Sequence, residues 1–203
     1  MSPHLALSGY GPLPERPLPG MSHYQPLLAY ARQPDDPGTQ ACASAIEIAR
    51  SSTRMAGRSR LGLDSTAWLA LLDQYFPGCP ASYRGSTGAN RNDGSDEFDD
   101  LVSLLMQHRL AGNPESVWLA HAIAAGCMGD DHLWQDLGLA NRQALSRLLA
   151  TWFPGLYATN TAGMRWKKFF YRQLCLQSGV KVCRSPTCEA CSEYTHCFGP
   201  EED

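Results

Sequence analysis

Four cysteines near the C-terminal end of the chain are the residues whose type and spacing point most directly to chemistry. Cys183, Cys188, Cys191 and Cys197 follow the pattern C-x4-C-x2-C-x5-C. Deprotonated thiols are soft ligands that suit iron–sulfur clusters, zinc and Cu(I). The N-terminal residues lack the basic segment and apolar run of a secretory signal, so we expect reduced thiols. The pattern therefore predicts a metal centre in a reducing compartment.

The spacing of these cysteines favours a cluster over a single ion. Zinc sites usually use two C-x2-4-C pairs separated by a longer spacer. This segment has one C-x2-C pair, and its outer gaps are only four and five residues long. The opening C-x4-C-x2-C matches the run found in plant-type ferredoxins. We expect an iron–sulfur-type cluster, and a zinc site stays the alternative.

A second, weaker candidate pair of ligands lies earlier in the chain. Cys127 and His132 flank a Gly-Asp turn and could offer soft and borderline donors to an incoming metal. The alternative is a buried thiol and a histidine that starts a helix. His196, next to Cys197, could likewise replace a cysteine or simply be exposed.

Basic side chains raise two further hypotheses. Lys167, Lys168 and Arg172 in the helix before the cysteines could offset the negative charge of thiolates and sulfides, or form a solvated face. Arg50, Arg54 and Arg58 are four residues apart. If one helix carries all three arginines, they form a stripe that could hold an oxyanion or simply face water.

Apolar residues recur with helical period from Thr39 onward, and runs of alternating β-branched residues are missing. The sequence therefore predicts an all-α fold. Asp64 and Asn113 are suitable N-cap residues. The expected helices span residues 40–50, 64–76, 96–110, 114–127, 140–152 and 162–178.

Composition divides the chain into three parts. Residues 1–38 hold eight of the fourteen prolines and predict an irregular leader, of which the part around Leu27 could pack on the body. Residues 39–180 predict the helical body, and residues 181–203 predict an irregular cysteine-rich tail that binds the metal. The Gly- and Ser-rich residues 78–94 predict a loop.

A weak internal repeat is visible in the body. Residues 61–78 and 137–155 both open with Leu-Gly-Leu, continue as a helix and close with Phe-Pro-Gly. Either the body holds two duplicated helical units packed face to face, or a helix with this stop signal recurs by chance.

Several functions find no support in the sequence. The formal net charge is −3, and nothing resembles a nucleic-acid-binding motif. No apolar run is long enough to span a membrane. Neither a Ser/His/Asp arrangement, a phosphate loop nor paired carboxylates stand out. We expect a carrier of metal rather than a turnover enzyme, without nucleic acid or membrane as a partner.

The aromatic and basic run at residues 166–171, followed by the four cysteines, resembles the nitrogen-fixation NifQ family, as do residues 132–139. The resemblance implies a cytoplasmic protein that supplies molybdenum for the nitrogenase iron–molybdenum cofactor. It further implies a molybdenum–iron–sulfur cluster on the four cysteines, molybdate as the metal source, and the cofactor scaffold complex and nitrogenase iron protein as partners. An iron–sulfur electron-transfer or redox-sensing protein and a zinc-stapled helical interaction module remain alternatives.

Overall fold

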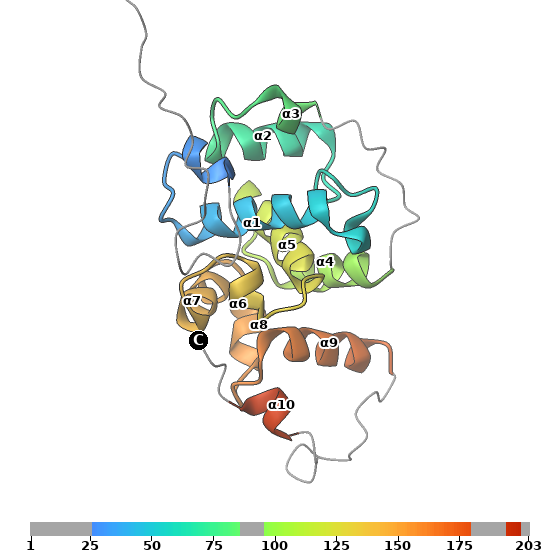
Figure 1. The fold of residues 1–203 in the computed structure, drawn as a ribbon. Coiled ribbons are helices and arrows are strands. Elements are labelled where there is room, and N and C mark those ends of the chain that lie inside the picture. The colour runs from blue at the N-terminus through green and yellow to red at the C-terminus, as the bar shows by residue number, and fades with distance from the viewer. Residues whose placement is uncertain (1–25, 86–95, 180–193, 200–203) are drawn as a thin grey trace, which may run out of the picture.

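The computed structural model describes residues 26–85, 96–179 and 194–199 (Figure 1). All regular elements in these ranges are helical, which confirms the predicted all-α fold. In chain order they are η1 (Pro26–Tyr30), α1 (Pro37–Ser51), η2 (Thr53–Met55), α2 (Ser65–Tyr75), α3 (Ala81–Arg84), α4 (Asp96–His108), α5 (Pro114–Cys127), α6 (Leu133–Asp136), α7 (Arg142–Trp152), α8 (Pro154–Thr159), α9 (Trp166–Gln177) and α10 (Tyr194–Phe198).

Helix α5 is the centre of the body. Its residues from Leu119 to Cys127 are almost all buried, because alanines and a glycine leave room for neighbours on every side. A Cβ atom on Gly126 would lie 2.7 Å from Leu137 Cδ2, so the glycine permits the close approach of the chain that follows α6. Helix α1 packs along α5, and α4 packs against both α5 and α9.

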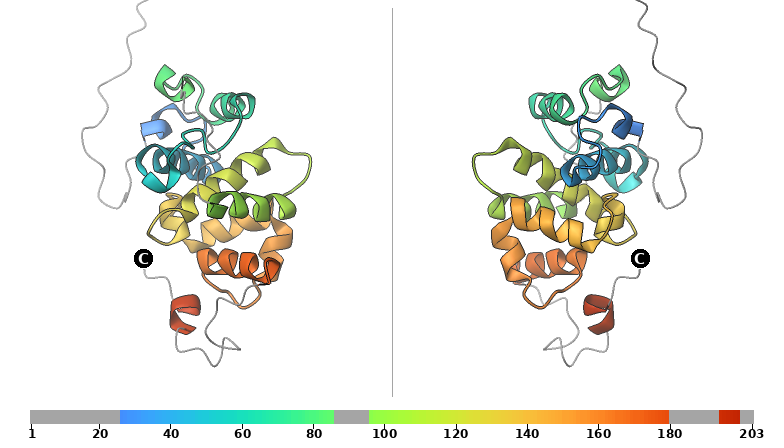
Figure 2. Two further views of the ribbon diagram at one scale, coloured as in Figure 1. Left: turned by 90° about the vertical axis from the view of Figure 1, so that its right-hand side faces the viewer. Right: turned by 90° about the vertical axis from the view of Figure 1, so that its left-hand side faces the viewer.

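The two repeat segments lie on opposite sides of this centre. Helix α2 lies above α1 and α5 in Figure 1, whereas α7 lies below them, and the side views agree (Figure 2). The helices that precede the two segments, α1 and α5, pack against each other, and so do the helices that follow them, α4 and α9. The duplication of the two units stays a prediction.

Three short elements fall in segments predicted to be irregular: η1 in the leader, α3 in the loop and α10 in the tail. Leu27 in η1 is fully buried in the core, within the predicted leader. Helix α3 lies in the predicted loop, where Trp68 Nε1 donates to the Tyr83 carbonyl oxygen at 3.0 Å. Residues 1–25 and 86–95 of the leader and the loop lie outside the described ranges.

The three arginines do not form a stripe, because α1 ends at Ser51. Arg50 stacks over the Tyr83 ring, and Arg54 donates to the Met128 carbonyl oxygen at 3.2 Å. Arg58 is buried and forms two 2.8 Å hydrogen bonds with the Asp99 carboxylate. The stripe that could have held an oxyanion or faced water is thus absent, and Arg58 joins the loop after η2 to helix α4.

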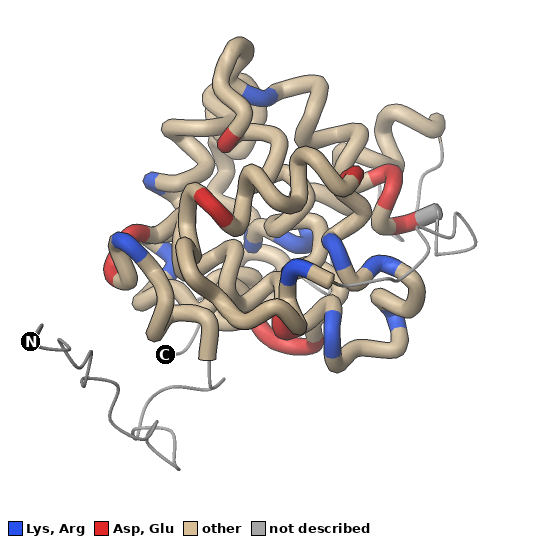
Figure 3. The backbone as a smooth tube through the Cα atoms, turned by 90° about the horizontal axis from the view of Figure 1, so that it is seen from above, with Lys and Arg blue, Asp and Glu red and all other residues tan. Residues whose placement is uncertain are grey.

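Among the described residues, none of the helices has both the length and the apolar composition needed to cross a membrane. Seen from above, several Lys and Arg positions gather on one side of the described body, at the lower right of Figure 3, whereas acidic positions are spread over several places.

Candidate metal centre

Of the four predicted cysteine ligands, the structure describes Cys197. It lies on α10, a short helix at the end of the body opposite to α2 (Figures 1 and 2). Cys197 and Phe198 are half-buried and pack against the core. Cys183, Cys188 and Cys191 lie outside the described residues, so their shared metal site stays a prediction.

Backbone hydrogen bonds fix α10 at the start of α9. The Arg165 N–H donates to the Cys197 carbonyl oxygen at 2.8 Å, and Arg165 Nε donates to the Gly199 carbonyl oxygen at 3.3 Å. A Cβ atom on Gly199 would lie 2.4 Å from the Thr195 carbonyl oxygen, so this position needs glycine. Arg165 therefore holds α10, and with it Cys197, at the start of α9.

The loop before Arg165 is itself held from two sides. Asn160 Oδ1 accepts from the Met164 N–H, and Asn160 Nδ2 donates to the Met164 carbonyl oxygen, both at 2.9 Å. Arg142 from α7 donates to the carbonyl oxygens of Gly163 and Met164. The side chains of two neighbouring elements thus set the position of Arg165.

Helix α9 carries an aromatic face inward. Trp166, Phe169 and Phe170 are buried and contact one another with ring centroids 5.7–6.0 Å apart. Trp166 also stacks on Tyr157 of α8, and its indole Nε1 donates to Ser146 Oγ at 3.3 Å. This packing leaves Lys168 and Arg172 exposed on the outer face.

Lys167 has a structural partner that the sequence did not reveal. Its ammonium group forms an ion pair with the buried Asp136 of α6 and donates to the Gly129 carbonyl oxygen at 2.8 Å. A Cβ atom on Gly129 would lie 2.3 Å from Asp136 Oδ1, so the glycine makes room for the carboxylate. The positive charge of Lys167 is therefore matched by Asp136, and among the described members of the basic set Lys168 and Arg172 are left to act on a cluster.

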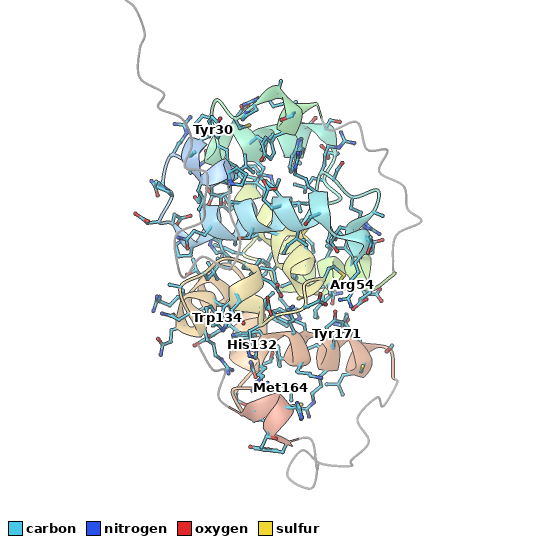
Figure 4. The ribbon with its side chains drawn as sticks, viewed as in Figure 1. Tyr30, Arg54, His132, Trp134, Met164 and Tyr171 are labelled. Carbon is cyan, nitrogen blue, oxygen red and sulfur yellow. The ribbon has the colours of Figure 1, made fainter. Side chains whose placement is uncertain are left out.

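Cys127 and His132 lie in different environments. Cys127 is buried at the end of α5, and burial raises the pKa of its thiol to about 12 although Lys167 opposes the shift. Burial therefore favours the protonated thiol over the thiolate that binds metal, and the suggestion that Cys127 is a ligand stays a prediction. His132 is half-buried at the start of α6, where its backbone N–H donates to Gln135 Oε1 (Figure 4).

A cavity of about 300 Å³ lies between the α5–α6 loop, the start of α9 and α10. His132 and His196 both line it, which brings together two candidates from distant parts of the sequence. Arg165 and Lys168 also face it. Within the described ranges, His, Cys, Asp and Glu side chains do not gather in any group of three that could hold a metal ion.

The sequence missed Asp136 and Gly129 as positioning residues. Asp136 follows a stretch rich in Gly and Asp, but nothing in the local sequence predicts its contact with Lys167. The two residues are thirty-one positions apart. The contact of Arg165 with α10 was also not predicted, because it is made to backbone carbonyl oxygens, which leave no trace in the residue types.

The fold and this site together define an all-helical protein in which a buried ion pair joins α6 to α9 and Arg165 holds a cysteine-bearing helix at the start of α9. The NifQ family model matches residues 41–199, a range that includes all four cysteines of the tail. The chain belongs to the NifQ family.

Individual relatives agree with this assignment. The chain is 43% identical to Protein NifQ of Azotobacter vinelandii over 152 residues, which covers 70% of this chain and 78% of that protein. It is 38% identical to Protein NifQ of Rhodobacter capsulatus over 143 residues, with the same coverage. It is 52% identical to Protein NifQ of Klebsiella pneumoniae over 81 residues, covering 39% of this chain and 48% of that one. No solved structure matches the chain.

Proposed function

We propose that this protein is a metal carrier that supplies molybdenum for assembly of the nitrogenase iron–molybdenum cofactor. Its cargo is a molybdenum–iron–sulfur cluster held by Cys183, Cys188, Cys191 and Cys197. The observation that carries the proposal is the family match, which runs through residue 199 and so includes the whole C-x4-C-x2-C-x5-C pattern. The donor set supports it, because thiolates are the ligands on which such clusters are built.

The described geometry fits a carrier in two ways. First, the helical body has its own continuous core. We therefore expect the body to stay folded when no metal is bound to the tail. Second, α10 carries Cys197 at one end of the body, where its neighbour His196 lines the same cavity as the exposed Lys168. Side chains at that end can bind an anionic cluster and leave it accessible to a partner.

Bound to sulfur ligands, molybdenum would be kept in the reduced, sulfur-coordinated state that cofactor assembly requires. The chain's own residues would hold and orient it: Arg165 fixes the position of Cys197, while Lys168 and Arg172 offset negative charge. The family suggests the cofactor scaffold complex and the nitrogenase iron protein as recipients, with molybdate as the source of molybdenum. We place the protein in the cytoplasm and assign it no turnover reaction.

Metal analysis tests the proposal directly. Protein purified without oxygen should contain iron, acid-labile sulfide and molybdenum. Iron and sulfide without molybdenum, together with a reversible one-electron couple, would favour electron transfer or redox sensing instead. A colourless protein with one zinc would favour the zinc-stapled interaction module.

Substitution of a tail cysteine provides the matched test. Cys191→Ala should remove iron and sulfide, whereas Cys175→Ala in α9 should retain both, because Cys175 lies outside the four-cysteine pattern. Far-UV circular dichroism of Cys191→Ala should stay helical because the body has its own core. Loss of helix in Cys191→Ala would mean that the site is structural and would contradict the carrier proposal.

A further inference from the structure

The outer face of α9 carries two cations and a large apolar side chain at a regular spacing. Lys168, Arg172 and Leu176 are four residues apart, so their side chains lie on one face of the helix. This face points away from the core, because Trp166 and Phe169 are buried on the opposite face. Lys168 and Arg172 are exposed, and Leu176 is 63% exposed, more than any other large hydrophobic side chain in the described ranges.

Large hydrophobic side chains that reach solvent are concentrated around this helix. Of the five such side chains in the described ranges, Tyr157, Leu176 and Tyr194 lie on α8, α9 and α10. Tyr157 stacks on the start of α9, and Arg165 holds α10 at the same place. In Figures 1 and 2 these helices lie on the side of the body away from α2. We refer to one set of exposed residues as the α9 surface: Lys168, Arg172, Leu176 and Tyr194.

The charges of the α9 surface favour a protein partner that is acidic. Among the described residues neither Lys168 nor Arg172 forms an ion pair, whereas the neighbouring Lys167 is matched by Asp136. Protein interfaces combine an apolar centre with a polar rim and are enriched in aromatic residues and arginine. Nucleic acid is the poorer fit, because it requires many phosphate contacts and this surface offers two cations on a chain of net charge −3.

The ends of the described chain explain why a partner would come to this surface. The described chain stops at Gly179, two residues after α9, and resumes at Tyr194 in α10. Cys183, Cys188 and Cys191 lie between these points, and none is more than six residues from one of them. Six residues span at most about 20 Å, close to the length of about 18 Å of a twelve-residue helix. A protein that takes metal from these thiols therefore comes within reach of α9.

We propose that the α9 surface docks an acidic face of the protein that receives the metal. The inference rests on the proposed function, because that function requires a recipient. Lys168 and Arg172 pair with carboxylates of the recipient, and Leu176 and Tyr194 supply the apolar contact. Pairing with the recipient and offsetting the charge of a cluster are compatible roles, since both use the same positive potential.

Binding of the full-length, metal-loaded protein to two purified probes, the cofactor scaffold complex and the nitrogenase iron protein, tests the proposal. Leu176→Ser should raise the Kd for at least one probe about tenfold, because an apolar contact is lost. Leu69→Ser on α2 is the matched control, since Leu69 is also exposed but lies at the opposite end of the body, and should change the Kd little. Equal effects of the two variants, or no binding of either probe at low salt, would overturn the proposal.

Charge reversal tests whether the partner is acidic. Arg172→Glu should raise the Kd by about tenfold or more, because a carboxylate then faces the carboxylates of the recipient. Arg32→Glu makes the same change in net charge at an exposed position beside the end of α2 and should raise the Kd less. Both are measured on preparations of equal iron content. An equal effect of the two variants would show that only net charge matters and would overturn the docking surface.

A second copy of the chain is the other possible occupant. Sedimentation velocity should show that the protein does not form a dimer that Leu176→Ser dissociates. Such a dimer would assign the surface to contacts between copies and overturn the inference.

Failure of this inference can be distinguished from failure of the proposed function. Leu176→Ser should retain iron and sulfide, and their loss would assign Leu176 to the cluster site instead of a docking surface. Unchanged binding in a Leu176→Ser protein that contains iron, sulfide and molybdenum would remove only the docking surface. Binding that depends on Leu176 in a protein without molybdenum would remove only the molybdenum carrier.

Discussion

The two Leu-Gly-Leu segments begin and end their helices alike but continue differently. Asp64 accepts from the Ala67 N–H at 2.8 Å at the start of α2, and Asn141 accepts from the Ala144 N–H at 2.9 Å at the start of α7. Both helices span eleven residues and stop at a buried phenylalanine. The backbone angles at these residues almost coincide, with φ −129° and ψ 57° at Phe76 and φ −134° and ψ 54° at Phe153.

The chain diverges immediately afterwards. Phe76 is followed by a turn in which Gly78 has a φ of +82°, whereas Phe153 is followed by α8 with Pro154 in its first turn. Helix α8 carries Tyr157 onto Trp166 and so helps to place α9. The comparison teaches that local signals set the ends of a helix, while the neighbouring elements decide what the chain does next.

A charged residue just before each segment forms an ion pair with a later helix, α4 for the first segment and α9 for the second. The signs of the charges are opposite in the two pairs. In the first, Arg58 is 3% exposed and pairs with Asp99 of α4, which is 54% exposed. In the second, Asp136 is 5% exposed and pairs with Lys167 of α9, which is 19% exposed. The buried charge is therefore the cation in one pair and the anion in the other.

The largest expected effect concerns this second pair. Lys167→Met should lower the free energy of unfolding by about 3–5 kcal/mol, because it leaves a buried carboxylate without its partner. Arg58→Met should cost less, since Asp99 is half exposed and water can solvate its carboxylate. Urea unfolding at pH 7 measures both variants.

Two results would bear on this comparison. An equal loss of stability in both variants would show that the exposure of the remaining partner does not control the cost. Partial recovery in the double variant Asp136→Leu/Lys167→Met would sharpen it, because removing both charges removes the uncompensated one.

The two N-caps should show equal and smaller effects. Asp64→Ala and Asn141→Ala should each cost about 1 kcal/mol, because each removes one side-chain acceptor from an otherwise similar helix start. Thermal or urea unfolding of the two variants provides the measurement. Costs that differ more than twofold would mean that the similarity of the two segments does not extend to their energetics.

The smallest expected effect is on how the stability of the protein changes with pH. It concerns a histidine of α5 that contacts the first segment and has no counterpart at the second. His121 of α5 lies beside Phe98, and its Nδ1 lies 2.7 Å from the Leu61 carbonyl oxygen. Burial lowers the pKa of His121, so below its ordinary value of 6.5 the unfolded chain binds a proton that the folded protein does not. Stability should therefore fall as the pH drops through 6.5 toward the lowered folded pKa.

His121→Gln keeps a donor for Leu61 and removes the titration. Its loss of stability between pH 7 and pH 5 should be smaller than that of the unsubstituted protein, as measured by urea unfolding at each pH. An unchanged loss would assign the acid sensitivity to other groups.

Much of the fold was predictable because its signals are local. The period of apolar residues predicted the six long helices, and Asp64 and Asn113 cap α2 and α5 as expected. The short helices α3, α6, α8 and α10 were not predicted, since four to six residues carry too little periodicity. The arginine stripe failed for a similar reason: nothing local distinguishes a helix that ends at Ser51 from one that continues to Arg58.

The sequence by itself determined the helical class, the helix caps and the cysteine pattern, because residue type and spacing along the chain are sufficient for these. Only the tertiary structure decided that Lys167 belongs to Asp136, that Arg165 holds Cys197, and that His132 and His196 share one cavity. These contacts join residues thirty or more positions apart. Their formation depends on how α5, α6 and α9 pack, and packing is a property of the whole core rather than of any local segment.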